Sequence, residues 1–330
     1  MIAPDATLLV TGGAGFIGSA LVRLLLRETG HRVVVLDALT YAGRGARLAT
    51  LQGHERLRFV RGDVGDAALV EELFAEEGFG GVLHLAAESH VDRSIQGPAV
   101  FVRTNVLGTQ VLLDAARQHG VQRFVQISTD EVYGALGPDG AFSETSPLRP
   151  SSPYSASKAG ADLLALAAHH TFGLPVCLTR GSNTYGPWQH PEKLIPVMIA
   201  AALDGRPLPV YGDGSNVREW MHVDDHCRGI LATLRRGRPG RSYNLGSGVE
   251  RSNLAVVHQI LDLLGAPRGQ VSFIADRPGH DWRYAVETAR ARDELGWQPQ
   301  REFDAAFAET IRWYVDHADW WRPLREADGA

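Results

Sequence analysis

The chain has 330 residues and a formal net charge of −5 at pH 7. This length exceeds the usual ~100–200 residues of one domain, so we expect one large α/β domain or two closely joined lobes. The arginines are scattered and the chain is slightly acidic, which predicts no nucleic-acid partner. No apolar run approaches the ~20 residues of a membrane span and no signal peptide precedes the first strand, so we expect a cytoplasmic protein with no membrane partner. Cys177 and Cys227 stand far apart without metal-binding neighbours, so we expect no metal and no disulfide.

A glycine-rich turn at residues 11–19 lies between an apolar strand and a helical pattern. The next strand, residues 33–36, ends on Asp37, roughly 20 residues past the last glycine, as a dinucleotide site requires. Glycines there allow a tight turn and close approach of a pyrophosphate to a helix N-terminus. A carboxylate at position 37 would accept the ribose hydroxyls and repel a 2′-phosphate, which favours NAD over NADP. The cofactor contacts expected here are Gly12, Gly15, Phe16, Ile17, Gly18 and Asp37.

Alternating strand and helix signals continue along the first half of the chain. A strand over residues 57–60 leads to Asp63 and Val64, and a nearly continuous apolar strand over residues 81–87 ends at Ala86 and Ala87. Such strands are typical of a parallel sheet that is covered on both faces, and ligands bind at the carboxyl edge of that kind of sheet. We therefore expect these four residues to contact the cofactor. The pattern predicts a Rossmann-type, doubly wound α/β fold with a smaller mixed α/β substrate-binding lobe.

Two long helices are predicted, one over residues 99–119 and one over residues 154–172. The second carries Tyr154 and Lys158, whose spacing of four places a phenol and an ammonium on one helical face. A nearby cation stabilises a phenolate, and the same ammonium can bind a nicotinamide ribose. After the strand 124–128 come Thr129, Asp130 and Glu131. We expect residues 1–180 to form the NAD-binding domain and residues 181–330 the nucleotide-sugar-binding domain, with part of 215–245 returning to the first.

The glycine turn together with Tyr154 and Lys158 resembles the extended short-chain dehydrogenase/reductase superfamily. Five further segments, at residues 86–94, 128–134, 191–196, 211–218 and 276–281, resemble the dTDP-glucose 4,6-dehydratase family within it. The sequence Thr129-Asp130-Glu131 is the most discriminating of these motifs. The resemblance spans residues 8 to about 297.

The resemblance implies a hydro-lyase that uses tightly bound NAD to convert dTDP-glucose to its 4-keto-6-deoxy derivative. Oxidation at C4 must come first, because it makes the C5 proton acidic. Tyr154 would take the C4 hydroxyl proton, with Lys158 beside it, and Thr129 would bind the ketone. Glu131 would then remove the C5 proton while Asp130, as a neutral acid, protonates the leaving C6 hydroxyl. Two adjacent carboxyls with opposite roles must differ in protonation.

The same resemblance implies substrate contacts at eight positions and a homodimer built by the two long helices. Those contacts are Ser89, Asn183, Glu192, Lys193, Tyr211, Arg218, Asn253 and Tyr284. Gly181, Thr184 and Trp188 depart from the family's usual residues, which leaves open a different base or sugar. The alternatives are a UDP-sugar 4,6- or 5,6-dehydratase, a 4-epimerase, and a catalytically silent NAD-binding scaffold.

Overall fold

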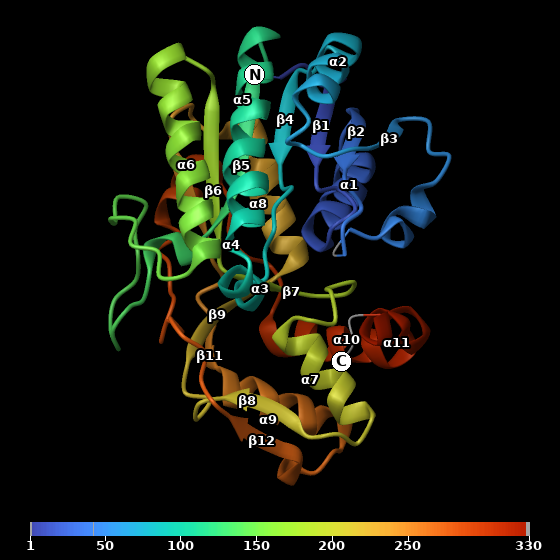
Figure 1. Ribbon diagram of the computed structural model, residues 1–330, viewed down its shortest axis with the longest axis vertical. Coiled ribbons are helices and arrows are strands. Elements are labelled where there is room, and N and C mark those ends of the chain that lie inside the picture. Colours follow the sequence, from blue (N-terminus) through green and yellow to red (C-terminus); the bar gives the residue numbers. More distant parts are fainter. Residues whose placement is uncertain (1, 42, 328–330) are drawn as a thin grey trace.

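The part of the chain that the computed structural model describes, residues 2–41 and 43–327, is organised around a seven-stranded sheet. Its strand order is β10-β6-β5-β4-β1-β2-β3, and every neighbouring pair is parallel. All of its strands therefore end at the same edge (Figure 1). The bounds are β1 Thr7–Thr11, β2 Arg32–Asp37, β3 Leu57–Arg61, β4 Gly81–His84, β5 Arg123–Thr129, β6 Val176–Gly181 and β10 Ser242–Leu245.

Helices cover both faces of this sheet, as a doubly wound fold requires. Helices α1 (Phe16–Glu28) and α8 (Val223–Arg236) bury their apolar sides in one core. Helices α2 (Ala67–Glu77), α5 (Gly108–Gln118) and α6 (Pro153–Phe172) pack in a second core against the opposite face. The predicted Rossmann-type α/β fold is thus confirmed. None of the helices described is long and apolar enough to cross a membrane.

Close contact between β1 and α1 depends on the glycines of the turn that joins them. A Cβ at Gly18 would lie 2.1 Å from the carbonyl oxygen of Gly12, so only glycine lets the helix approach this closely. Gly12 itself has φ +67° and lies against the backbone of Ala86, where a Cβ would be 2.7 Å from the Ala86 nitrogen. The turn is therefore held directly beside the end of β4.

The helix predicted over residues 99–119 is less regular than its sequence pattern indicates. It runs as α4 (Pro98–Phe101), a π-helical turn (Val102–Leu107) and α5, and it follows a short helix α3 (Val91–Gln96). The π turn directs the buried Asn105 side chain toward the sheet edge, where its Nδ2 donates to the Glu88 carbonyl and the Ser157 hydroxyl at 3.0 and 2.8 Å. Such turns occur frequently at functional sites, and apolar periodicity does not reveal them.

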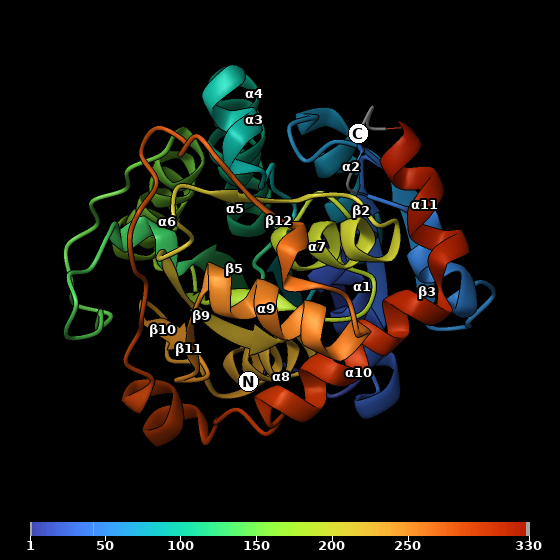
Figure 2. The same cartoon turned by 90° about the horizontal axis from the view of Figure 1, so that it is seen from below.

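A smaller mixed lobe lies beyond the carboxyl ends of the main sheet (Figures 1 and 2). One small sheet has the order β11-β9-β7, and strands β12 and β8 form a parallel pair. Helices of this lobe enclose a third apolar core. Its elements are β7 Asn183–Tyr185, α7 Leu194–Leu203, β8 Leu208–Tyr211, β9 Val217–His222, β11 Glu250–Ser252, α9 Asn253–Leu264, β12 Val271–Ile274, α10 Phe303–Asp316 and α11 Ala318–Ala327.

The chain crosses between the two lobes more than once. After β9 it returns to the main sheet through α8, which packs on α1, β5 and β6, and through β10, which pairs with β6. Because β9 leads directly into α8, the smaller lobe is fixed against the carboxyl edge of the sheet at this junction.

Candidate active site

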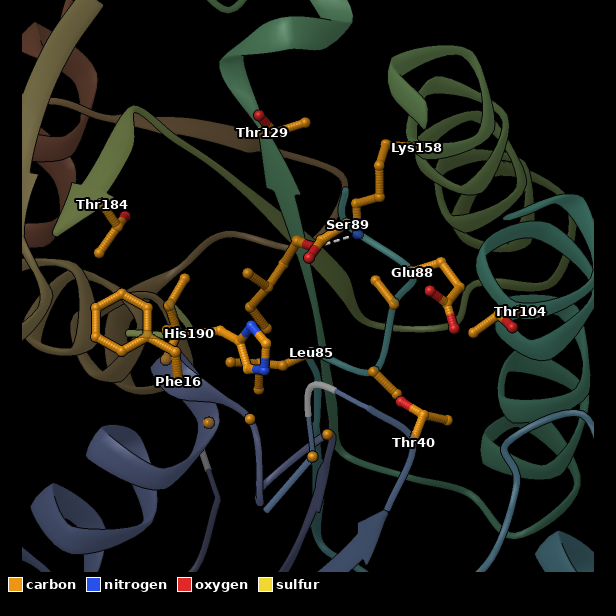
Figure 3. Close-up of a pocket in the computed structure, with 18 of the residues that line it drawn as sticks. Phe16, Thr40, Leu85, Glu88, Ser89, Thr104, Thr129, Lys158, Thr184 and His190 are labelled. Atoms are coloured by element: carbon orange, nitrogen blue, oxygen red, sulfur yellow. Dashed lines mark hydrogen bonds between the residues drawn. The ribbon is translucent and has the colours of Figure 1, made fainter. Parts of the chain in front are cut away.

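A cavity of about 330 Å³ opens at the carboxyl edge of the main sheet, facing the smaller lobe. Its lining comes from the ends of β1, β2, β4, β5 and β6, from α6, and from the segment that leads into α7 (Figure 3). The structure brings to this one cavity all of the residues predicted to bind the cofactor or to act in catalysis. They are Gly12, Gly15, Phe16, Ile17, Gly18, Asp37, Asp63, Val64, Ala86, Ala87, Thr129, Asp130, Glu131, Tyr154 and Lys158.

The glycine turn at one end of the cavity suits a dinucleotide phosphate. Helix α1 begins after Gly15 with no side chain capping its first amide groups, so these donors remain available to an anion. A Cβ at Gly15 would come within 3.1 Å of the Gly12 carbonyl oxygen, so glycine keeps this cradle open. The residues present therefore fit NAD.

Asp37 ties the end of β2 to the same turn. Its Oδ2 accepts a hydrogen bond from the Ala14 amide at 2.9 Å, and its Oδ1 accepts one from the Leu39 amide at 2.8 Å. Burial raises the pKa of Asp37, and these two backbone bonds oppose that shift. Each carboxylate oxygen still has a lone pair for a ribose hydroxyl.

The reactive end of the cavity lies where β5 meets the first turns of α6. Ser152 caps this helix by accepting from the Ser155 amide, and Pro153 occupies the first helical position. The next residue is Tyr154, which is 9% exposed. Thr129 stands at the end of β5 and Lys158 reaches into the cavity from α6 (Figure 3).

Burial and then the charge of Glu131 raise the pKa of Tyr154, and a hydrogen bond with the Thr129 hydroxyl opposes this shift. Lys158 donates from Nζ to the Ile127 carbonyl at 2.7 Å. Burial lowers the pKa of Lys158 to about 8, against the charge of Asp162, so the group remains largely cationic at neutral pH. The phenol therefore needs the cations around it to act as a base.

Asp130 is the more deeply desolvated of the two adjacent acids. It is 1% exposed, its Oδ1 accepts from the Thr129 hydroxyl at 3.2 Å, and its Oδ2 has no hydrogen-bond partner among the described residues. Burial, then the charges of Glu131 and Glu219, raise the pKa of Asp130 well above its ordinary value. These surroundings favour the neutral acid.

Glu131 meets a different electrostatic environment. Burial raises its pKa as well, but the positive charges of Arg218, Arg277 and Lys193 oppose that shift. The neighbouring acids thus differ in the way that opposite proton-transfer roles require, because the charges around Glu131 favour its ionised form more than those around Asp130 do. The sequence alone did not reveal this difference.

Four of the predicted substrate contacts also line the cavity: Ser89, Asn183, Glu192 and Lys193. Lys193 donates from Nζ to the Ser89 carbonyl at 2.7 Å, which links the entry to α7 with the end of β4. Asn183 has a buried Oδ1 without a hydrogen-bond partner in the described part of the chain. Glu192 lies 3.6 Å from the Arg93 Nε.

The other four predicted substrate contacts lie in the smaller lobe and do not line this cavity. Arg218 donates to the carbonyls of Val217, at 2.7 Å, and Asp281, at 2.9 Å, and its guanidinium lies 4.6 Å from the centre of the Tyr284 ring. Tyr211 donates to Asp92 at 3.3 Å. Asn253 begins α9 with a buried side chain whose Oδ1 makes no hydrogen bond within the described residues.

Several cavity residues escaped the sequence analysis. Arg47, which is 1% exposed, donates to the carbonyls of Ala14 and Trp188 at 3.1 and 2.9 Å, and Thr104 comes from the π turn. His226 lines the cavity from the first turn of α8. None of these side chains belongs to a spacing motif, so the sequence carried no signal for them.

The three departures from the family pattern lie in different surroundings. Gly181 and Thr184 line the cavity. Trp188 instead packs its ring on Trp313 and Trp320, at 4.9 and 5.0 Å between ring centres, beneath the C-terminal helices. It has φ +71°, a conformation that costs energy for a non-glycine residue.

No metal centre is found in residues 2–41 and 43–327, where no cluster of three His, Cys, Asp or Glu side chains has suitable geometry. Cys177 and Cys227 are buried free thiols.

Known proteins resemble this chain over nearly its whole length. A model of the family described as GDP-mannose 4,6 dehydratase matches residues 9–310. A dTDP-glucose 4,6-dehydratase of Streptomyces griseus is 56% identical, with 96% of each chain covered. The crystal structure of DesIV, a dTDP-glucose 4,6-dehydratase from Streptomyces venezuelae solved with NAD bound, has a TM-score of 0.94 and 53% identity over 96% of this chain and 99% of that chain. A UDP-glucose 4-epimerase from Thermotoga maritima has a TM-score of 0.88 but 28% identity, over 94% of this chain and 99% of that chain.

The desolvation of Asp130 predicts a pH-dependent cost in stability. Because its pKa is higher in the folded than in the unfolded chain, the wild type loses stability as pH rises above the ordinary carboxyl range, by at most ~1.4 kcal/mol per pH unit. Asp130→Asn removes the carboxyl group and with it this pH-dependent loss of stability. Relative to wild type and without cofactor, the free energy of unfolding of Asp130→Asn in urea should increase as the pH is raised above about 5. A difference in free energy of unfolding between Asp130→Asn and wild type that stays constant over this range would contradict the assignment.

Proposed function

Because the chain belongs to the dTDP-glucose 4,6-dehydratase family, we propose that it converts dTDP-α-D-glucose to dTDP-4-keto-6-deoxy-α-D-glucose and water, with no net use of NAD. The observation that carries this proposal is the different electrostatic environment of Asp130 and Glu131 beside Tyr154. A dehydratase needs an acid and a base for elimination in addition to the groups that serve oxidation.

Oxidation at C4 comes first, because the C5 proton becomes acidic only beside a ketone. In our proposal Tyr154 removes the C4 hydroxyl proton, and Lys158 and Thr129 stabilise the charge that develops around it. The burial of all three side chains supports this role, since charge interactions are stronger away from water. When bound, NAD supplies the hydride acceptor for this step, the hydride donor for the last step, and a positive charge beside the phenol.

Elimination then uses the two acids. Glu131 removes the C5 proton, and three neighbouring cations favour its ionised form against the effect of burial. Asp130 gives its proton to the leaving C6 hydroxyl, which departs as water. Its buried Oδ2 has no hydrogen-bond partner in the described structure, so it is available to face the substrate.

The nucleotide sugar is proposed to extend from this centre into the smaller lobe. Lys193, Asn183 and Ser89 lie on the wall between the reactive end and that lobe, which suits contacts to the sugar and diphosphate. Arg218 lies under the Tyr284 ring and carries the positive charge that a diphosphate requires. The base would then meet Tyr211 and Asn253 near the outer strands and α9, or Glu192 on the wall of the cavity.

We also propose that the chain is divided into the two binding domains that the sequence predicts. Residues 1–180 would hold NAD, and residues 181–330 would hold the nucleotide sugar, with α8 and β10 completing the first unit. The pairing of β10 with β6 supports this division. Cytoplasmic action is proposed as well, and the two buried free thiols suit a reducing compartment.

The protein is proposed to act as a homodimer through the outer faces of its two long helices. Large apolar side chains are exposed there: Val102 and Leu107 on one helix, at 55% and 53%, and Leu163 and Phe172 on α6, at 58% and 59%. These two helices pack side by side on one face of the main sheet. Paired with a second copy, they would form a four-helix bundle that buries this surface.

The substrate is tested by incubating the purified protein with dTDP-glucose, UDP-glucose or dTDP-galactose. The products are analysed by mass spectrometry and NMR. We expect that only dTDP-glucose loses one water and gains a C6 methyl group and a C4 ketone. Conversion of UDP-glucose instead would overturn the base assignment, a C4 epimer would indicate an epimerase, and no turnover of any nucleotide sugar would favour a silent scaffold.

Single substitutions should separate oxidation from elimination. Asp130→Asn and Glu131→Gln should each lower dehydration by ~10²–10⁴-fold, because a general acid or base is lost. Both should still oxidise substrate, so reduced nicotinamide should accumulate and be visible by absorbance. Tyr154→Phe should lower both steps. Asp139→Asn is the surface control, and equal loss of oxidation in all three active-site variants would argue against the assigned roles.

The dimer surface is tested by Leu163→Glu. A buried charge at the centre of the helix pair should shift the sedimenting species from dimer to monomer at micromolar concentration. Leu263→Glu, at a similarly exposed leucine on α9, should leave the dimer unchanged. A monomeric wild type, or a dimeric Leu163→Glu variant, would exclude this interface.

A further inference from the structure

His226 is a buried histidine of the cavity wall that the proposed chemistry does not use. It lies in the first turn of α8, is 2% exposed, and lines the cavity. Its Nε2 is buried and makes no hydrogen bond to any described residue. A buried polar atom without a partner is costly, so its presence in a cavity wall indicates that a ligand completes it.

The ring of His226 occupies space that only glycine leaves open. A Cβ at Gly181 would lie 2.5 Å from Cε1 and 2.6 Å from Nε2 of this histidine. The imidazole therefore rests against the α-carbon of Gly181, at the end of β6. A larger residue at position 181 would push the ring away from its present place.

Hydrogen bonding favours one tautomer of His226. The Thr184 hydroxyl lies 3.1 Å from the Ser182 carbonyl and 2.8 Å from His226 Nδ1, and it satisfies both contacts only when it donates to the carbonyl and accepts from an Nδ1 that carries the proton. Burial lowers the pKa of His226 to about 4, so the ring is neutral at physiological pH. With the proton on Nδ1, Nε2 is a hydrogen-bond acceptor.

This acceptor lies close to the reactive end of the cavity. In the pairing of β5 with β6, Gly181 stands directly opposite Thr129, and neighbouring strands are only about 4.8 Å apart. Thr184 and Phe16 lie on the side of the cavity away from Glu88 and Thr104 (Figure 3). The hydroxyl of Ser182, also buried and without a hydrogen-bond partner within the described chain, belongs to the same wall.

The wall therefore offers an acceptor and a hydroxyl donor next to the position of hydride transfer. A primary carboxamide carries the complementary pair, an NH₂ donor and a carbonyl acceptor. The nicotinamide ring bears such a group next to the carbon that exchanges hydride. Hydride transfer requires that ring to lie beside Tyr154 and Thr129.

We propose that His226 Nε2 accepts a hydrogen bond from the carboxamide NH₂ of bound NAD, and that Thr184 and Gly181 hold the imidazole in place for this contact. His226 is thus a cofactor-orienting residue that determines which way the nicotinamide ring is turned. The inference rests on the proposed function only in taking NAD as the cofactor of this cavity.

The test measures binding rather than turnover. Protein freed of cofactor is titrated in a calorimeter with NAD and with 3-acetylpyridine adenine dinucleotide, in which a methyl group replaces the NH₂. The analogue leaves Nε2 buried and unpaired, so the wild type should bind it about 5- to 100-fold more weakly.

Three substitutions test whether His226 causes the difference in affinity between NAD and the analogue. His226→Phe keeps the ring and removes the acceptor, so both dinucleotides should bind with nearly equal affinity. His226→Gln restores an amide oxygen and should recover part of the preference for NAD. Thr184→Val frees the tautomer and should also reduce the preference. His258→Phe, on α9 outside the cavity, is the matched control and should bind like wild type.

Equal affinities in the wild type would overturn the proposal, as would full discrimination in Thr184→Val or in a His226→Phe variant with a native circular dichroism spectrum. Turnover of dTDP-glucose is measured separately on the same preparations. Loss of turnover with intact discrimination rejects the proposed reaction, whereas normal turnover without discrimination rejects the role of His226.

Discussion

The site depends on one constraint, the parallel pairing of every strand in the main sheet. Parallel strands end at one edge, so the glycine turn after β1, Asp37 after β2 and the acids after β5 reach the same cavity although they are far apart in sequence. The register in which β5 pairs with β6 has a second consequence for the site. It sets Thr129 beside Gly181, so that a reacting group and the support for His226 are only one strand spacing apart.

The smaller lobe supplies the asymmetry between the two acids. Successive residues of a strand point to opposite faces, and β9 uses this alternation at Arg218 and Glu219. The negative charge of Glu219 raises the pKa of Asp130, whereas the positive charge of Arg218 opposes the rise that burial causes in the pKa of Glu131 and, as a smaller cause, in that of Asp130. The backbone amides of Gly248 and Val286 donate hydrogen bonds to Oε1 and Oε2 of Glu219, at 2.7 and 2.9 Å, and so hold its carboxylate in place. One short strand thus contributes to the different environments of two neighbouring acids, provided that the lobes stay docked.

Local patterns predicted the fold class, the cofactor and the family, because glycine spacing, strand periodicity and the Tyr154–Lys158 pair are local properties, and the structure and comparisons confirm all three. The roles of individual site residues remain predictions. What the sequence could not give arises from contacts between distant segments. The π turn at Asn105 depends on hydrogen bonds to Glu88 and Ser157, and the environment of Asp130 depends on Glu219 in another lobe. Apolar periodicity reports one face of one element, so it misses both.

The departures from the family pattern take on a different meaning in three dimensions. On sequence alone they left open a changed base or sugar. In the structure the Thr184 side chain contacts His226, Gly181 makes room for that ring, and Trp188 packs beneath the C-terminal helices. Arg218 and Tyr284, which pack on each other in the smaller lobe, do not line the cavity that Gly181 and Thr184 line. Substitutions at Gly181 and Thr184 would therefore act first on the support of the His226 ring, and the one at Trp188 on the packing of the smaller lobe.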